Sequence, residues 1–184
     1  MTRRPLGRSH PKLTEHVVDD FLDYRWIPSG GFDACVWCLG PSQGSVSKAA
    51  FVTITHDYAV AAATALLAAN PRVRFCFVSS RTADPTEHSR ARYERIKGRT
   101  ERSLSTIGID LFVFRPGYIR GTTTRKPRGF LARYVGPVMA WCFGLFLSDL
   151  QIGCDELARG LLAVAVRGAD NHLLDNAAIR RQVS

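Results

Sequence analysis

The stretch Arg90–Gly108, RARYERIKGRTERSLSTIG, predicts a helix with one cation on its apolar side. The segments around this helix indicate the fold and the position of a candidate site. At 100° of rotation per residue, one stripe of this helix collects mainly apolar and small side chains. Lys97 falls inside that stripe, although an ammonium group facing a core is costly unless it has a partner or a task. The stripe holds Tyr93, Ile96, Thr100, Leu104 and Ile107, and the opposite side holds Arg92, Arg95, Arg99 and Arg102.

Apolar segments of strand length lie on both sides of this helix. Segments 32–40 (FDACVWCLG), 73–80 (VRFCFVSS) and 109–117 (IDLFVFRPG) are apolar almost throughout, which is typical of strands buried on both faces of a parallel sheet. Helical patterns alternate with them, so we predict an α/β fold with a doubly wound, Rossmann-like parallel sheet. The other predicted elements are short strands at 15–21 and 171–176, a helix at 47–70 capped by Ser45 or Ser47, and a helix at 154–168.

The composition is typical of one soluble domain spanning residues 1–184. Hydrophobic residues make up 46% of the chain, and the formal net charge is +9, which permits binding to the phosphates of a nucleotide, a nucleic acid or a lipid surface. Five cysteines without a secretory signal predict a reducing, cytoplasmic setting. The longest apolar run, 134–147, has fourteen residues and is too short to span a bilayer, so we expect a buried or interfacial helix and no transmembrane segment.

The predicted carboxyl ends of the strands bring together residues suited to proton transfer. Ligands of parallel sheets bind beyond these ends, which are Gly40, Ser79-Ser80 and Pro116-Gly117. Tyr93 and Lys97 lie one helical turn apart on one face, and Ser80 ends the preceding strand. A cation beside a phenol stabilises the phenolate, which makes the phenol a proton donor and acceptor for carbonyl/alcohol interconversion, while a serine hydroxyl can hold the carbonyl oxygen.

On these residues the chain resembles the short-chain dehydrogenase/reductase superfamily, in particular the atypical branch of Tat-interacting-protein-like oxidoreductases and NAD-dependent epimerase-like proteins. The resemblance runs along nearly the whole chain. YxxxK alone is a weak signal, but YxxxKG between a strand ending in VSS and a strand ending in FRPG is specific. The matching stretches are TRRPL…HPKL, VVDD, FDACVWCLG, AFVTITHDYAVAAA, FCFVSS, YERIKGRTE, FRPGYIRG and DELARGLL.

The resemblance implies an NAD(P)-dependent oxidoreductase acting on an unknown small molecule. Tyr93 would be the catalytic acid/base, Lys97 would bind the nicotinamide ribose and stabilise the Tyr93 phenolate, and Ser80 would position the substrate. Arg3 and Arg4 would meet the adenosine 2′-phosphate, which favours NADP over NAD. The other implied cofactor contacts are Asp20 near the adenine, Leu39 and Gly40 near the adenosine ribose, and Pro116 and Gly117 near the nicotinamide.

One part of the family pattern is absent. No GxGxxG or GxxGxxG occurs in the chain, although in the family this loop holds the pyrophosphate at a helix N-terminus. We therefore expect an N-terminally incomplete, truncated domain that lacks the first strand and the glycine-loop helix, with 118–150 as a substrate-side loop and helix. The expected consequences are weak or absent dinucleotide binding, impaired activity and an open strand edge that pairs with another chain.

Other classes of function stay open. The main alternative is a non-catalytic Rossmann-like module that regulates or scaffolds a partner, and cofactor retention separates it from the oxidoreductase. A basic nucleic-acid or membrane-surface binder is a third class, but the arginines of 90–133 lack interleaved aromatics, which disfavours nucleic acid. We predict no metal site, because Cys35 and Cys38 are expected on opposite faces of one strand, reduced and buried. His56 and Asp57 are expected on a polar helix face.

Overall fold

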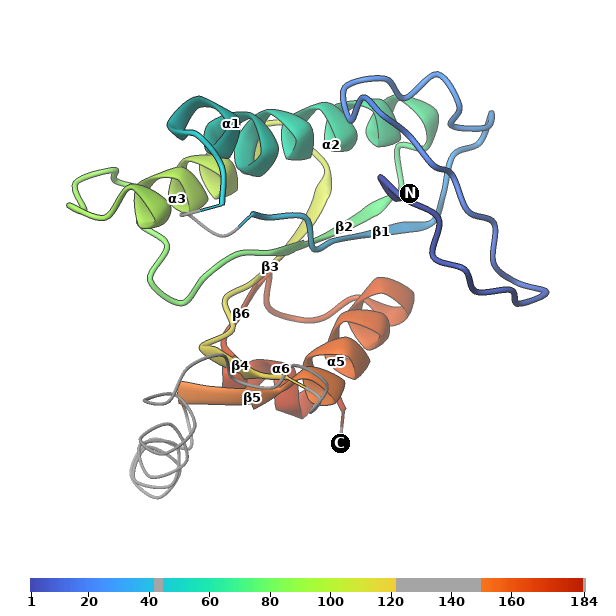
Figure 1. The fold of residues 1–184 in the computed structure, drawn as a ribbon. Coiled ribbons are helices and arrows are strands. Elements are labelled where there is room, and N and C mark those ends of the chain that lie inside the picture. Colours follow the sequence, from blue (N-terminus) through green and yellow to red (C-terminus); the bar gives the residue numbers. More distant parts are fainter. Residues whose placement is uncertain (42–44, 122–149, 184) are drawn as a thin grey trace, which may run out of the picture.

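The computed structural model describes residues 1–41, 45–121 and 150–183, and its central feature is a four-stranded parallel sheet (Figure 1). The strands β1 (Ala34–Trp37), β2 (Arg74–Val78), β3 (Asp110–Phe114) and β6 (Leu173–Leu174) lie in that order across the sheet. All three pairings are parallel. The strands fall inside the segments predicted from the sequence, so the mixed α/β class with a parallel sheet is confirmed.

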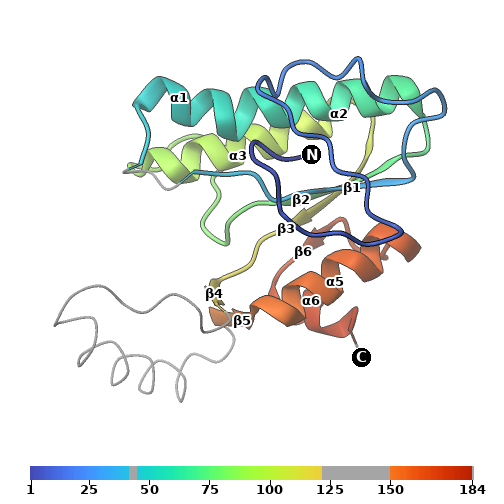
Figure 2. The ribbon, with the colours of Figure 1, turned by 45° about the vertical axis from the view of Figure 1, so that its right-hand side comes forward.

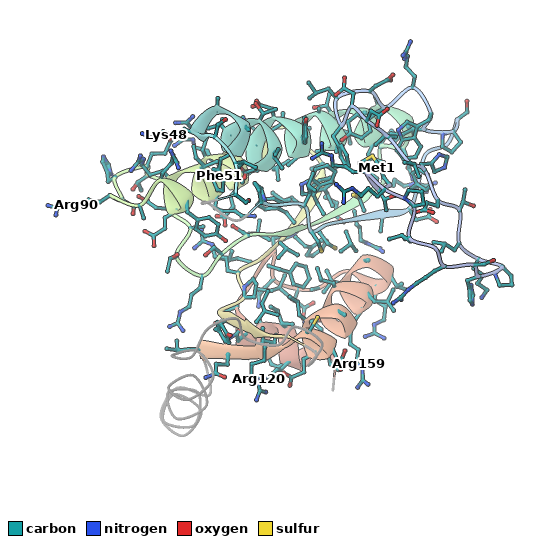
Figure 3. All side chains as sticks on the ribbon, viewed as in Figure 1. Met1, Lys48, Phe51, Arg90, Arg120 and Arg159 are labelled. Carbon is teal, nitrogen blue, oxygen red and sulfur yellow. The ribbon has the colours of Figure 1, made fainter. Side chains whose placement is uncertain are left out.

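One face of the sheet is covered by helices that follow β1 and β2. The first helical segment consists of α1 (Lys48–Val52), one π-helical turn η1 (Thr53–Asp57) and α2 (Tyr58–Ala69), and the second is α3 (Arg92–Ser105). The Ser47 hydroxyl accepts the N–H of Ala50 at 3.2 Å, so Ser47 is the N-cap. The Phe51 side chain is fully buried and lies between α1 and α3 (Figure 3). The hydrophobic core on this face contains Ala59, Ala62, Ala63, Leu66, Phe75, Phe77, Leu104 and Val113.

The other face carries α5 (Cys154–Arg167) and α6 (Asn176–Arg181). Two short strands, β4 (Tyr118–Arg120) and β5 (Gln151–Gly153), form a separate parallel pair beside them. The second core packs Cys76 of β2 and Phe112 and Phe114 of β3 against the apolar side of α5. Because both faces of β2 and β3 are covered, these strands need apolar residues at every position, which explains the continuous apolar runs in the sequence.

The N-terminal segment 1–33 departs from the sequence prediction. The strand expected at 15–21 is not formed, since Val17 makes only an isolated parallel bridge with Thr2. One bridge does not build a ladder, and the segment is instead anchored by Phe21, which is buried in the core with Trp37. The segment runs past β1 without adding a strand to the sheet (Figure 2).

Two further predictions concern residues 118–149. The substrate-side loop expected from residue 118 begins instead with β4, because Tyr118–Arg120 pair with Gln151–Gly153. The buried or interfacial helix expected at 134–147 lies outside the described residues, as does most of the predicted substrate-side segment 118–150.

The helical segment Lys48–Ala69 is the one part of the described chain that could cross a membrane by length and composition alone. It has 22 residues and a mean hydropathy of 1.3. Its alanine-rich side is buried in the core of the sheet, with Ala59 and Ala63 fully inaccessible to solvent. An apolar core helix satisfies the same length and hydropathy test, so the segment is accounted for by its place in the fold.

Gly98 lets α3 approach the loop that precedes it. A Cβ atom built on Gly98 would lie 2.0 Å from the backbone carbonyl of Asp84, a distance that neither backbone can keep. We predict that Gly98→Ala destabilises the protein by about 3 kcal/mol or more, because overpacking against backbone outweighs the roughly 1 kcal/mol that alanine gains over glycine in a helix. Urea unfolding measures the change. Gly121→Ala, with no atom of the described residues within 4 Å of its Cβ, is the control, and equal effects of the two substitutions would contradict the close approach.

Candidate functional site

The Lys97 side chain points from α3 to the carboxyl end of β2. Only 5% of Lys97 is exposed, although its helix is strongly basic. Its ammonium donates a hydrogen bond of 2.9 Å to the carbonyl oxygen of Val78, the last residue of β2, and lies 4.8 Å from the centre of the Phe77 ring. The prediction that Lys97 turns toward the sheet is therefore confirmed. The carbonyl and the ring supply the partners that a buried cation needs.

The electrostatic environment of Lys97 makes it an unusual lysine. Burial lowers the pKa of Lys97 from its usual 10.5 to about 8, and the Glu101 carboxylate one helical turn further along α3 opposes part of that shift. A lysine with such a pKa is still mostly charged at neutral pH, but it releases its proton far more readily than an exposed lysine. The group can therefore act either as a cation or as a proton carrier near neutral pH.

A buried ion pair lies beside Lys97 and was not predicted. Glu101 is 7% exposed and accepts two bonds from the Arg115 guanidinium, at 3.0 Å and 2.5 Å, as well as a hydrogen bond from the Ser79 hydroxyl. This network joins α3 to the ends of β2 and β3. A signal was present in the sequence, because Glu101 lies 80° from the centre of the apolar stripe at Tyr93 and thus on its border. Ser79, rather than its neighbour Ser80, is the buried serine of this turn.

Tyr93 and Ser80 lie at the same end of the sheet but are not bonded to Lys97. Tyr93 is half-buried, and its ring packs 6.1 Å from the ring of Phe51. The Ser80 hydroxyl lies 3.3 Å from the Thr82 hydroxyl within its own turn. Within the described part of the chain, no hydrogen bond joins any two of Tyr93, Lys97 and Ser80. The structure thus brings the three residues to one end of the sheet, but each side chain contacts other residues rather than the other two.

Leu39, Gly40, Pro116 and Gly117 follow the strand ends, as the sequence predicted. Gly40 is close to Lys97, since a Cβ built on it would lie 3.9 Å from the Lys97 ammonium. Gly117 has a structural reason to be glycine, because a Cβ there would lie 2.0 Å from the carbonyl oxygen of Leu150. The Gly117 N–H also donates to the Asn176 side chain at 3.0 Å, which ties this turn to α6.

The N-terminal residues predicted to contact the adenosine part of the cofactor make their contacts elsewhere, away from the carboxyl ends of the strands. Arg3 and Arg4 are exposed, and Arg3 borders a hollow beside β1 that is lined mainly by apolar side chains. The Asp20 carboxylate accepts the N–H of Leu22 at 2.8 Å, which makes a local turn. No contact between these three residues and Lys97 or the strand ends is present in the described residues.

The described cysteines are unpaired thiols, and His56 is bonded to two polar side chains. Cys35, Cys38, Cys76 and Cys154 are free thiols. The prediction that Cys35 and Cys38 are both buried within one strand is wrong, because Cys35 lies in β1 but is only partly buried, and Cys38 is exposed after β1 ends at Trp37. His56 bridges Asp57 and Ser103, at 2.8 Å and 3.0 Å, on the outer side of the helices. In the ranges that the structure describes, no three His, Cys, Asp or Glu side chains are grouped to hold a metal ion.

Comparison with models of known protein families finds no match to this chain. Comparison with curated proteins finds no match either.

The lowered pKa of Lys97 predicts a pH-dependent stability. Between about pH 8 and pH 10.5 the unfolded chain binds more protons at this lysine than the native protein, so the contribution of Lys97 to stability rises with pH in that window. At about 1.4 kcal/mol per pKa unit, the total rise is on the order of 3 kcal/mol. We expect wild type to gain this much relative to Lys97→Met in denaturant unfolding at a series of pH values.

The comparison with Lys97→Met removes the effect of other groups. Burial raises the pKa of Cys35 and of Cys76 to about 12, which lowers stability as pH rises, but both thiols are present in both proteins. Lys48→Met, which changes an exposed lysine, is the control and should follow wild type. A constant difference between wild type and Lys97→Met across the window would contradict the buried, partly desolvated ammonium.

The buried ion pair predicts a second stability effect. Glu101→Gln keeps the shape of the side chain but leaves the Arg115 guanidinium without a countercharge, so we expect a loss of about 3 kcal/mol in the free energy of unfolding at pH 7. The exposed pair Asp23–Arg25 is the comparison, and Asp23→Asn should have little effect because water screens it. Thermal or urea unfolding of both variants tests the difference, and equal small effects would show that the Glu101 pair is not effectively buried.

Proposed function

We propose that this α/β unit is a Rossmann-like domain of the short-chain dehydrogenase/reductase type that transfers a hydride between NADP or NAD and a carbonyl or alcohol substrate. The observation that carries the proposal is the Lys97 ammonium, which is buried at the carboxyl end of a central parallel strand, one helical turn after Tyr93. Ligand sites of parallel sheets lie beyond these strand ends. A structural lysine is rarely buried there without a carboxylate in direct contact.

The chemistry follows from the residue types. When bound, the nicotinamide supplies or accepts the hydride. The Tyr93 hydroxyl gives a proton to the carbonyl oxygen, or takes one from the alcohol, and the Lys97 ammonium stabilises the phenolate left behind. The Ser80 hydroxyl holds the same oxygen by a hydrogen bond. Such a step requires the Tyr93 ring to turn from Phe51 toward Lys97, and Ser80 to exchange its contact with Thr82 for the substrate.

The chain fits one half of a dinucleotide better than the other. On the nicotinamide side, Lys97 offers a cation to ribose hydroxyls, and Gly40 presents no side chain beside it. On the pyrophosphate side, the sequence contains no glycine-rich GxGxxG turn that would direct backbone N–H groups at the phosphates. We therefore propose weak dinucleotide binding in which Lys97 is the main anchor, with Arg3 and Arg4 favouring NADP through the 2′-phosphate.

Cofactor titration tests the proposal. We expect NADPH to bind the purified chain weakly, with at least a tenfold loss in Lys97→Met and no change in Lys48→Met, as measured by the fluorescence of the reduced nicotinamide. With a panel of small carbonyl compounds, Tyr93→Phe should lose NADPH oxidation while Tyr118→Phe, which alters a 71% exposed tyrosine, should not. Binding that is indifferent to Lys97, or no binding at millimolar cofactor, would refute the proposal.

A second candidate is a non-catalytic Rossmann-like module that regulates or scaffolds a partner. It is favoured by the fact that the Lys97 ammonium already has a carbonyl acceptor and an aromatic ring as partners. In this case the Lys97 cation acts as a structural tie between α3 and β2. The two candidates are separated by the same titration combined with unfolding, because a structural Lys97 affects stability without any dinucleotide binding.

A further inference from the structure

The outer edge of β1 offers backbone hydrogen-bonding groups to another strand. β1 is the terminal strand of the sheet, and it pairs only with β2 among the described strands. The N–H of Arg74 donates to the carbonyl of Asp33 at 3.0 Å, and Ala34 is in register with Arg74. Backbone groups of alternate strand residues point to opposite edges, so those of Ala34 and Val36 point away from β2. An unpaired edge of this kind is a template for strand addition.

Apolar surface borders this edge on both faces of the sheet. On the α2 side a hollow of about 630 Å³ lies between β1 and the N-terminal segment, with Phe21, Tyr24 and Trp37 in its lining. On the α5 side a second hollow of about 630 Å³ is lined by Val36, Leu162 and Val166. These three side chains are 44%, 64% and 66% exposed, which is unusual for aliphatic residues grouped on adjacent elements.

The hollow on the α2 side contains donors that lack acceptors. The indole N–H groups of Trp26 and Trp37 are buried, and no acceptor in the described residues bonds to either. Both tryptophans line this hollow. Buried donors are almost always satisfied in native proteins, so the two indoles are available to carbonyl oxygens of a group bound in this hollow. An extended polypeptide carries such oxygens along its whole length.

The charges around the edge select the kind of partner. Arg3 borders the hollow on the α2 side and Arg72 the one on the α5 side, and both are exposed, against a single carboxylate in the two linings, that of Asp33. Arg74 also borders the hollow on the α5 side, but it pairs with Asp110 at 3.6 Å and so adds less to the attraction. A second copy of this chain brings a net charge of +9 to the same place and is repelled, whereas acidic residues are attracted.

We propose that the β1 edge is a docking site for an extended segment of another protein that is apolar on both faces, flanked by acidic residues, and adds a strand to the sheet. The opposite edge of the sheet is a poorer site, because β6 has only two residues and the ring of His172 stacks on Phe112 beside it at 4.8 Å. The proposal does not depend on the chemistry at Tyr93, Lys97 and Ser80, because none of these residues lines either hollow. Of the residues assigned above to the cofactor, Arg3 and Leu39 line the hollow on the α2 side.

Synthetic peptides test the docking site. The probe is a nonapeptide with two acidic residues at each end and five β-branched residues between them. One comparison peptide has lysines at its ends, and another has a central proline that prevents strand pairing. Fluorescence anisotropy should show the acidic peptide binding at least tenfold more tightly than either comparison peptide. Amide hydrogen exchange should slow at Ala34 and Val36 on binding and stay unchanged at Leu173 and Leu174.

Variants of the protein locate the site. Val36→Asp and Leu162→Asp should each weaken binding of the acidic peptide at least tenfold, and Leu173→Asp, which changes an exposed residue of the opposite edge strand, should leave it unchanged. Leu162 lies outside the sheet, so its variant tests the site even if Val36→Asp disturbs β1. Equal binding of the proline peptide, protection elsewhere in the chain, or a micromolar homodimer that Val36→Asp dissociates would overturn the proposal.

Discussion

The hydrogen bond from the Lys97 ammonium to the Val78 carbonyl oxygen ties α3 to the carboxyl end of β2. Gly98, the next residue of α3, has no side chain against the Asp84 backbone, which lets α3 lie close to the loop that precedes it. Burial then separates Lys97 from water and lowers its pKa. The packing of α3 therefore sets both the position of Lys97 and its pKa, and the proposed function depends on this residue.

The charges near Lys97 form a network rather than separate pairs. Glu101 lies one helical turn from Lys97, bonds Arg115 after β3 and accepts from Ser79 after β2. The Glu101 carboxylate raises the pKa of Lys97 and so opposes part of the lowering that burial causes. The network fixes three elements at the edge where ligands of parallel sheets bind, and so it supports any chemistry at Tyr93 without taking part in it.

The two sides of the molecule differ in how completely they are covered. The strands β2 and β3 are buried by helices on both faces, whereas β1 has an open edge and apolar hollows beside it. The N-terminal segment borders this edge and contributes Phe21 to the core without pairing with β1. An α/β sheet that ends in an apolar strand is incomplete by the usual rule that edges are paired, covered or charged. Strand addition by an acidic partner satisfies that rule.

The sequence by itself determined the α/β class, the three apolar strands, the alanine-rich helix and the inward direction of Lys97. These features are local or periodic, because burial on two faces demands continuous apolar residues and a helix repeats every 3.6 residues. Only the tertiary structure decided three other features. These are the absence of a strand at 15–21, the ion pair of Glu101 with Arg115, and the exposure of Cys38. A strand forms only where a neighbouring strand pairs with it, and Val17 pairs only with Thr2. A charge is buried only where residues distant in sequence bond to it, as Arg115 and Ser79 bond to Glu101.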